Sequence, residues 1–177
     1  MALEVVFETH ATTEDNEAGI ASGWLPGRLS KAGEEQARQM GNRRRDDRLA
    51  AVFSSDLLRA WQSVEIAFPD GSVPVLFDWR LRECDYGASN GSPAEGLDRR
   101  AHLDVAYPGG ESWREAIARV EAAVRDLRVG WDGRRILLVG HTATRWALDH
   151  MVLGTPIAEL IAAPFVWQPG WEYVVPV

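Results

Sequence analysis

The sequence predicts an α/β domain in which a mostly parallel central sheet is flanked by helices. Short apolar, β-branched runs alternate along the chain with segments whose apolar residues recur at helical spacing. Such continuous apolar runs are typical of parallel strands covered on both faces. The chain has 177 residues, 46% of them hydrophobic, which suits one domain with a sizeable core. We therefore expect a single domain over residues 1–177.

Five segments are predicted as strands because they are apolar and bounded by polar or turn-forming residues. In chain order they are Leu3–Phe7, Ala51–Phe53, Val73–Phe77, Ile136–Val139 and Tyr173–Val175. The last strand belongs to the segment FVWQPGWEYVV, which we expect to close over an edge of the sheet.

Four segments with helical periodicity lie between the strands. Ser112 and Glu115 form a capping box before one of them, and Gly154 ends another. The run Arg43-Arg44-Arg45 follows the first helix, and its simplest interpretation is a solvated helix end beside the favourable C-terminal dipole. The predicted helices are Ser30–Gly41, Asp56–Phe68, Trp113–Leu127 and Thr142–Leu153.

Residues 84–110 are polar and rich in glycine and proline. The segment is too long for a simple connector, so we expect it to form a lid or a wall over a site.

Composition excludes several classes of protein. The formal net charge of -7 argues against a nucleic-acid binder, which needs a broad basic face. The absence of a long apolar run or a basic leader predicts neither a membrane span nor a signal peptide, and the single cysteine fits the cytoplasm. Cys84 lacks the C-x5-R pattern of cysteine phosphatases, and four histidines are few for a two-metal site. We expect no metal and no cofactor.

Polar groups follow four of the predicted strands. They are His10, Ser54-Ser55-Asp56, Arg82-Glu83 and Gly140-His141. In open α/β sheets, sites form at the carboxyl ends of the strands, so these groups are expected to lie together. Taken alone, His10 would be a turn-capping or packed histidine; the four groups together favour a chemical role.

Two histidines, an arginine and a carboxylate suit phosphoryl transfer. A neutral imidazole can attack phosphorus and form a phosphohistidine. Arginine and a second histidine can balance the charge on the phosphoryl oxygens. A carboxyl group can protonate the leaving alcohol and later deprotonate water, and no metal is required.

At these residues the sequence resembles the histidine phosphatase superfamily, the phosphoglycerate-mutase-like proteins, over most of its length. His10 and Asn16 keep the spacing of that family's N-terminal motif, and Ser22-Gly23-Trp24 continues it. The further matching stretches are SSDLLRAWQS, LRECDYG, PGGESW and VGHTATRWAL. The resemblance implies a phosphoglycerate-mutase-like three-layer sandwich.

The resemblance also implies roles for individual residues. His10 would be the phosphate-accepting nucleophile and Glu83 the proton donor, while Arg59 and His141 would hold the phosphoryl group. Asn16 and the Thr142 backbone amide would add hydrogen bonds to the phosphoryl oxygens. The remaining positions, on the substrate side of the site, are Ser22, Gly23 and Tyr86.

The match breaks at the opening motif, where the family has Arg-His-Gly and this chain has Thr9-His10-Ala11. Threonine offers one neutral hydroxyl in place of a guanidinium that grips phosphate with two hydrogen bonds. Glu8 would add negative charge if it pointed into the site, although strand alternation puts it on the opposite side from Thr9. Candidate replacements for the missing arginine are Arg28, Arg82 and Arg145. The simpler interpretation of each is a surface or packing residue.

The function expected from these residues is hydrolysis of a small phosphomonoester through a phosphohistidine. One alternative is a weak or inactive family member that binds a phosphorylated or anionic ligand. Another is a phosphoglycerate-type mutase, for which only Arg99-Arg100 offers an anion clamp, and a third is transfer of a different group. We expect a small phosphorylated substrate, no nucleic acid and no membrane as partners, and a homodimer stays open.

Overall fold

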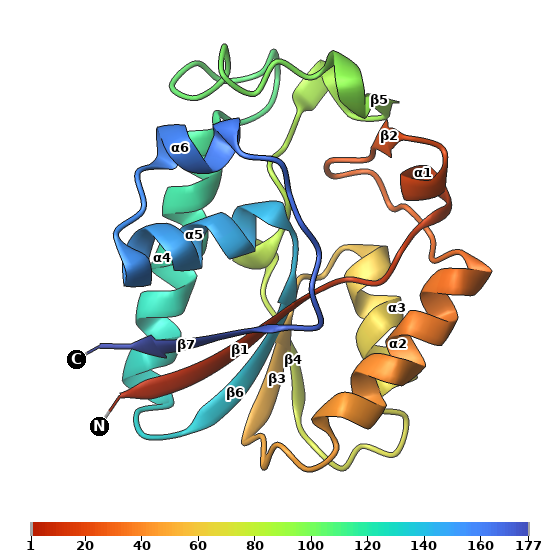
Figure 1. Ribbon diagram of the computed structural model, residues 1–177, viewed down its shortest axis with the longest axis vertical. Coiled ribbons are helices and arrows are strands. Elements are labelled where there is room, and N and C mark those ends of the chain that lie inside the picture. The colour runs from red at the N-terminus through yellow and green to blue at the C-terminus, as the bar shows by residue number, and fades with distance from the viewer. Residues whose placement is uncertain (1, 177) are drawn as a thin grey trace.

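The computed structural model describes residues 2–176 and contains a five-stranded sheet in the order β4-β3-β6-β1-β7. Four strands are parallel and β7 runs antiparallel to β1 at one edge (Figure 1). The predicted fold class is therefore confirmed. The strands are β1 (Leu3–Thr9), β3 (Ala51–Ser54), β4 (Val75–Phe77), β6 (Arg135–Gly140) and β7 (Trp171–Val175).

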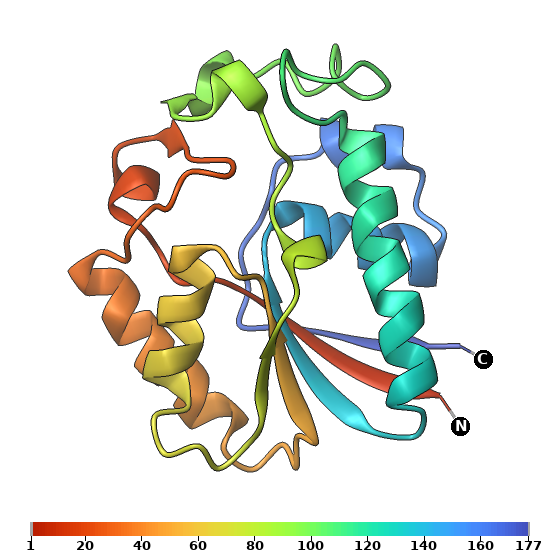
Figure 2. The ribbon, with the colours of Figure 1, turned by 180° about the vertical axis from the view of Figure 1, so that it is seen from behind.

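Helices cover both faces of this sheet and make a three-layer sandwich. Figures 1 and 2 show α2 and α3 on one side, and α4, α5 and α6 on the other. The short α1 (Glu14–Glu17) follows β1. The other helices are α2 (Lys31–Arg44), α3 (Leu58–Ala67), α4 (Trp113–Gly130), α5 (Thr142–Leu153) and α6 (Ile157–Ala162).

The apolar stripe of α4 forms much of the larger core. Trp113, Ile117 and Val120 are at most 1% exposed because they pack between the sheet and α5. The predicted capping box starts this helix: the Glu115 N–H donates to the Ser112 hydroxyl at 3.2 Å, and the Ser112 N–H donates to the Glu115 carboxylate at 2.8 Å. Burial of this stripe is what fixes α4 on the sheet.

Several element ends differ from the sequence prediction by a few residues, and two of these differences have a clear physical cause. β4 begins at Val75 because Pro74, which has no N–H to donate, only accepts a hydrogen bond from the Val52 N–H. Helix α2 continues through Gly41 to Arg44. Gly41 is a close-packing position there, since a Cβ would lie 2.2 Å from the Ala67 carbonyl oxygen on α3.

The prediction that the arginine run is a solvated helix end is wrong for Arg43 and Arg44. Glu8 points to this side of the sheet and is 1% exposed. Its carboxylate accepts from Arg43 Nη2 at 3.0 Å and from Arg44 Nε at 2.8 Å. A carboxylate buried beneath the helix end draws both guanidinium groups inward. Its charge is thus balanced on the face away from Thr9.

Residues 84–110 form the end of the molecule above α1 (Figure 1). Their short strand β5 (Ser92–Pro93) pairs with β2 (Ile20–Ala21), beside the turns η2 (Gly87–Ser89) and η3 (Ala94–Gly96). A further turn, η1 (Trp79–Leu81), follows β4. Within residues 2–176, no helix has the length and apolar character needed to cross a membrane.

Candidate active site

The two histidines meet where β1 and β6 end. Thr9 pairs with Gly140 in the parallel register, and the His10 N–H donates to the Gly140 carbonyl at 2.9 Å. The imidazole rings that follow lie 5.0 Å apart between centroids. They open onto a cavity of about 340 Å³. Its lining is Thr9, His10, Thr12, Asn16, Gln36, Glu83, His141, Thr142, Phe165 and Trp167.

The hydrogen bonds of His10 fix its tautomer. Its Nδ1 lies 2.7 Å from the Ala11 carbonyl oxygen, which can only accept, so Nδ1 carries the proton. The lone pair of Nε2 then accepts from Arg59 Nε at 3.2 Å. Ser63 holds the turn in place, because its hydroxyl accepts from the Ala11 N–H at 2.9 Å and donates to the Arg59 carbonyl at 2.7 Å. The result is an imidazole with an unprotonated Nε2.

Arg59 lies beneath the histidines and is 3% exposed. Its Nη2 donates to the Gly23 carbonyl at 2.8 Å and lies 3.3 Å from His141 Nδ1, while Nη1 donates to the Leu25 carbonyl at 3.0 Å. Gly23 has a φ of +54°, and a Cβ there would lie 1.8 Å from Asn90 Oδ1. Only glycine can therefore present this carbonyl to the guanidinium.

His141 presents an unpaired donor. Because Arg59 can only donate, His141 Nδ1 accepts from it and Nε2 bears the proton. The residue is 1% exposed, and among residues 2–176 no group pairs with its Nε2. A buried N–H without a partner at the edge of a cavity suits an anionic oxygen.

Glu83 reaches the same place from the loop after η1. One carboxylate oxygen accepts from the Cys84 N–H at 2.9 Å and the Ala143 N–H at 3.1 Å, and the other accepts from the Thr142 N–H at 3.1 Å. The carboxylate thus lies at the N-terminus of α5, where backbone N–H groups and the helix dipole favour negative charge. The Glu83 carbonyl is held by Trp24 Nε1 at 2.7 Å and by Arg119 Nη2 at 3.1 Å.

Both imidazoles are held neutral. Burial, assisted by the positive charge of Arg59, lowers the pKa of His10 to about 3, against the opposing effect of its hydrogen bond to Ala11. Burial, Arg59 and His10 hold the pKa of His141 well below its ordinary value. At neutral pH His10 therefore keeps the lone pair that a nucleophile needs.

The lowered pKa of His10 predicts a pH dependence of stability. Unfolding returns the pKa from about 3 to its ordinary 6.5, so the unfolded chain binds more protons between these values and stability falls as the pH drops through that window. We expect His10→Gln to lose less stability than the wild type between pH 7 and pH 4. Urea denaturation at several pH values measures this, and equal losses in both proteins would contradict it.

Three predicted substrate-side residues lie outside the cavity lining. The Ser22 hydroxyl donates to the Asp15 carboxylate at 2.6 Å, and the Gly23 carbonyl accepts from Arg59. The Tyr86 ring packs edge-on against Tyr107, with ring centroids 5.3 Å apart. The described lining of the cavity includes the neighbouring Glu83 but no residue of segment 84–110. The segment expected as a lid therefore forms no wall of this cavity.

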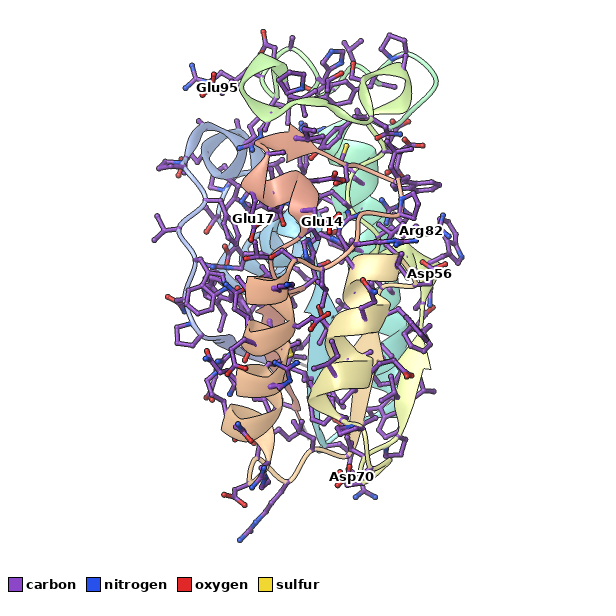
Figure 3. The ribbon with its side chains drawn as sticks, turned by 90° about the vertical axis from the view of Figure 1, so that its right-hand side faces the viewer. Glu14, Glu17, Asp56, Asp70, Arg82 and Glu95 are labelled. Carbon is purple, nitrogen blue, oxygen red and sulfur yellow. The ribbon has the colours of Figure 1, made fainter. Side chains whose placement is uncertain are left out.

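None of the three arginines considered as replacements for an arginine at position 9 lines the cavity. Arg82 pairs with Asp56 through two hydrogen bonds of 2.7 Å, and Figure 3 shows this pair at the edge of the molecule. Arg145 pairs with Asp149 at 2.8 Å, and Arg28 is exposed. In the part of the chain that the structure describes, the cavity lining includes no lysine or arginine.

Sequence reasoning missed four lining residues: Thr12, Gln36, Phe165 and Trp167. The aromatic character of FVWQPGW was visible, but it was interpreted as cover for the sheet edge. Trp24 does not line the cavity, and its Nε1 donates to the Glu83 carbonyl. Cys84 is buried, and this burial raises the pKa of its thiol, which keeps it protonated. No set of three or more candidate metal ligands occurs among residues 2–176.

Comparison with known proteins agrees with this geometry. A probable phosphoglycerate mutase GpmB from Salmonella typhi is 33% identical over 164 residues, covering 87% of this chain and 76% of that protein. The structure of Bacillus stearothermophilus YhfR superposes with a TM-score of 0.84 at 25% identity, covering 95% of this chain and 88% of that one. The structure of a mycobacterial glucosyl-3-phosphoglycerate phosphatase superposes with a TM-score of 0.78 at 27% identity, covering 91% of this chain and 87% of that one. Residues 5–166 match the sequence model of the histidine phosphatase superfamily (branch 1), and the chain therefore belongs to that superfamily.

Proposed function

We propose that the protein hydrolyses a small phosphomonoester through a phosphohistidine on His10. The observation that carries this proposal is the state of the His10 ring, with Nδ1–H bound to the Ala11 carbonyl and an unprotonated Nε2 at the cavity. The buried, unpaired Nε2–H of His141 beside it supports the same conclusion. The solved relative described as a phosphatase is consistent with this chemistry.

In the first step, the lone pair of His10 Nε2 attacks phosphorus and forms the P–N bond. The P–O bond to the alcohol breaks, its electron pair goes to the leaving oxygen, and Glu83 supplies the proton. In the second step, Glu83 takes a proton from water, whose oxygen forms a new bond to phosphorus. The P–N bond breaks, its electrons return to Nε2, and inorganic phosphate leaves.

The phosphoryl oxygens require donors in both steps. Arg59 now donates to the ring nitrogens of both histidines, and a bound phosphoryl group would take over these donors. His141 Nε2–H and the Thr142 N–H would complete the set, and loss of the Thr142 bond would free a Glu83 oxygen to carry its proton. Asn16, which lines the cavity, would add its amide. These donors stabilise the charge of the transition state.

Hydrolysis is favoured over the mutase reaction by the charge of the cavity. A phosphoglycerate carries a carboxylate beside its phosphate, and the lining residues include no lysine or arginine to bind it. Incubation with 3-phosphoglycerate distinguishes the two reactions. We expect release of inorganic phosphate and no 2-phosphoglycerate; accumulation of 2-phosphoglycerate would establish the mutase alternative.

Thr9→Arg is expected to raise turnover. The substitution would place a guanidinium beside His10, and a charge-assisted hydrogen bond to phosphate is worth about 1.5–3 kcal/mol, or roughly tenfold to a few hundredfold in rate. Phosphate release is measured for both proteins with sugar phosphates, phosphoglycerates, nucleotides and an aryl phosphate. Thr9→Ser is the matched control and should stay near the wild-type rate.

The same experiment tests the alternative that the chain is an inactive binder. A silent wild type with an active Thr9→Arg variant would mean that threonine has disabled the phosphate clamp. Silence in both proteins would overturn the proposed hydrolysis.

A further inference from the structure

We propose that the catalytic cavity selects monoesters of uncharged alcohols that carry a planar apolar ring, which packs against Trp167 and Phe165. This proposal rests on the proposed function for the phosphoryl end of the ligand. It adds the class of leaving group. Three features of the cavity carry it: an aromatic wall, the rigid attachment of that wall, and the absence of cations from the lining.

The wall comes from the connection between α6 and β7, which descends between α5 and the α2–α3 pair in Figure 1. Phe165 and Trp167 from this connection line the same cavity as His10 and Glu83. Trp167 is 55% exposed, so its indole ring faces solvent at the cavity and is not packed in the core. An exposed aromatic face beside reactive groups is a surface on which a planar ring can stack.

The wall is attached to the core. The Phe165 ring lies 6.0 Å from the Trp171 ring between centroids, and the Trp171 ring lies 5.4 Å from the buried Phe7 ring on β1. Phe165 is half-buried by these contacts. A line of ring contacts therefore runs from the core to Phe165, and Phe165 lines the cavity together with Trp167.

The other end of the connection is fixed by Arg44. Its Nη2 donates to the Pro169 carbonyl at 3.0 Å while its Nε binds the buried Glu8 at 2.8 Å. A Cβ at Gly170 would lie 2.0 Å from the same guanidinium, so the backbone approaches it closely. The Gln168 side chain closes the turn by donating to the Gly170 carbonyl at 2.8 Å. A wall held in this way loses little freedom when a ligand binds.

The charge and size of the cavity define the ligand further. Among the described residues that line the cavity there is no lysine or arginine, so an anionic leaving group would find no counterion in the lining. Thr12 and Gln36 offer neutral hydrogen-bonding groups. The volume of about 340 Å³ lies at the small end of ligand pockets, which suits a phosphate and one ring.

Four substrates with saturated carbon at the ester oxygen test this preference: benzyl phosphate, cyclohexylmethyl phosphate, glycerol 3-phosphate and 3-phosphoglycerate. Because all four release an alkoxide-type oxygen, differences in kcat/KM report recognition of the alcohol more than its leaving ability. We expect benzyl phosphate to exceed glycerol 3-phosphate by about tenfold. Cyclohexylmethyl phosphate should lie between them, and 3-phosphoglycerate should be the poorest. A preference for 3-phosphoglycerate would overturn the proposal.

Variants locate the preference on the wall. Trp167→Ala is expected to lower kcat/KM for benzyl phosphate about tenfold and to leave glycerol 3-phosphate within about twofold. Trp167→Phe, which keeps a planar ring, should retain most of the preference. Val166→Ala is the matched control, because Val166 belongs to the same connection, is 73% exposed and does not line the cavity. Equal losses on both substrates in Trp167→Ala would overturn the proposal.

Calorimetry with benzylphosphonate and methylphosphonate separates this inference from the proposed reaction. If the protein shows no turnover but binds benzylphosphonate more tightly than methylphosphonate, and Trp167→Ala removes this difference, the proposed hydrolysis is overturned and the proposed binding of the ring is supported. Turnover without any preference for the ring would overturn the ring site alone. Failure of both phosphonates to bind, with no turnover, would overturn both.

Discussion

His10→Ala is expected to lower kcat for phosphate release by about four orders of magnitude or more, as loss of the nucleophile does in other covalent hydrolases. Alanine supplies no lone pair for the P–N bond, and Glu83 and Arg59 cannot replace it. The measurement is steady-state phosphate release, together with a search for acid-labile, base-stable phosphoprotein after rapid mixing. The wild type should form this phosphoprotein and the variant should not.

The matched control is His150→Ala, which removes a histidine on α5 whose side chain is 38% exposed. It should release phosphate at the wild-type rate. Because Ala at position 10 also removes a buried ring, thermal melts establish that both variants are folded. A His10→Ala protein that is folded and keeps a tenth or more of the wild-type rate would exclude the phosphohistidine route.

Glu8→Gln is expected to lower the free energy of unfolding by about 3 kcal/mol, at the lower end of the cost of breaking a buried ion pair. The amide oxygen still accepts one hydrogen bond, but Arg44, whose side chain is 10% exposed, loses the more buried of its two carboxylate partners and keeps only Asp47, 3.0 Å away. Urea denaturation at pH 7 measures the change. Arg44 also donates to the Pro169 carbonyl, so the connection that carries Trp167 is held less firmly when Arg44 loses Glu8. We therefore expect a protease to cleave this connection faster in the variant.

Glu4→Gln provides the control on the same strand. Glu4 pairs with Arg135 at 3.2 Å, but its side chain is 55% exposed, so water screens the pair. Its loss should cost less than about 1 kcal/mol. A cost for Glu8→Gln as small as that of Glu4→Gln would mean that the arginines find other partners and do not depend on Glu8.

The sheet and its helices could be predicted because their signals are local. The apolar runs of β1, β3 and β6 and the stripe on α4 follow periods of chain geometry, and the capping box of Ser112 and Glu115 is complete within four residues. The ends of elements were less certain. Gly41 reads as a helix stop in sequence but is a packing position against α3, which depends on a residue far along the chain.

The candidate site could be predicted in part for a topological reason. His10 and His141 end neighbouring parallel strands, so the sheet itself brings them together. Glu83 was also identified, although its contacts with the N-terminus of α5 join residues about 60 positions apart. The tautomers of the histidines and the unpaired donor on His141 depend on such contacts and have no sequence signal.

The sequence by itself determined the fold class, the order of the elements and the family of this protein, because periodicity and motif spacing are written along the chain. Only the tertiary structure decided that Arg44 binds Glu8 beneath the end of α2 and that Trp167 lines the cavity. It also decided that Arg82 and Arg145 pair with Asp56 and Asp149 and do not line the cavity. Each of these outcomes is a competition among distant partners for burial and charge, and that competition is settled only when the chain is folded.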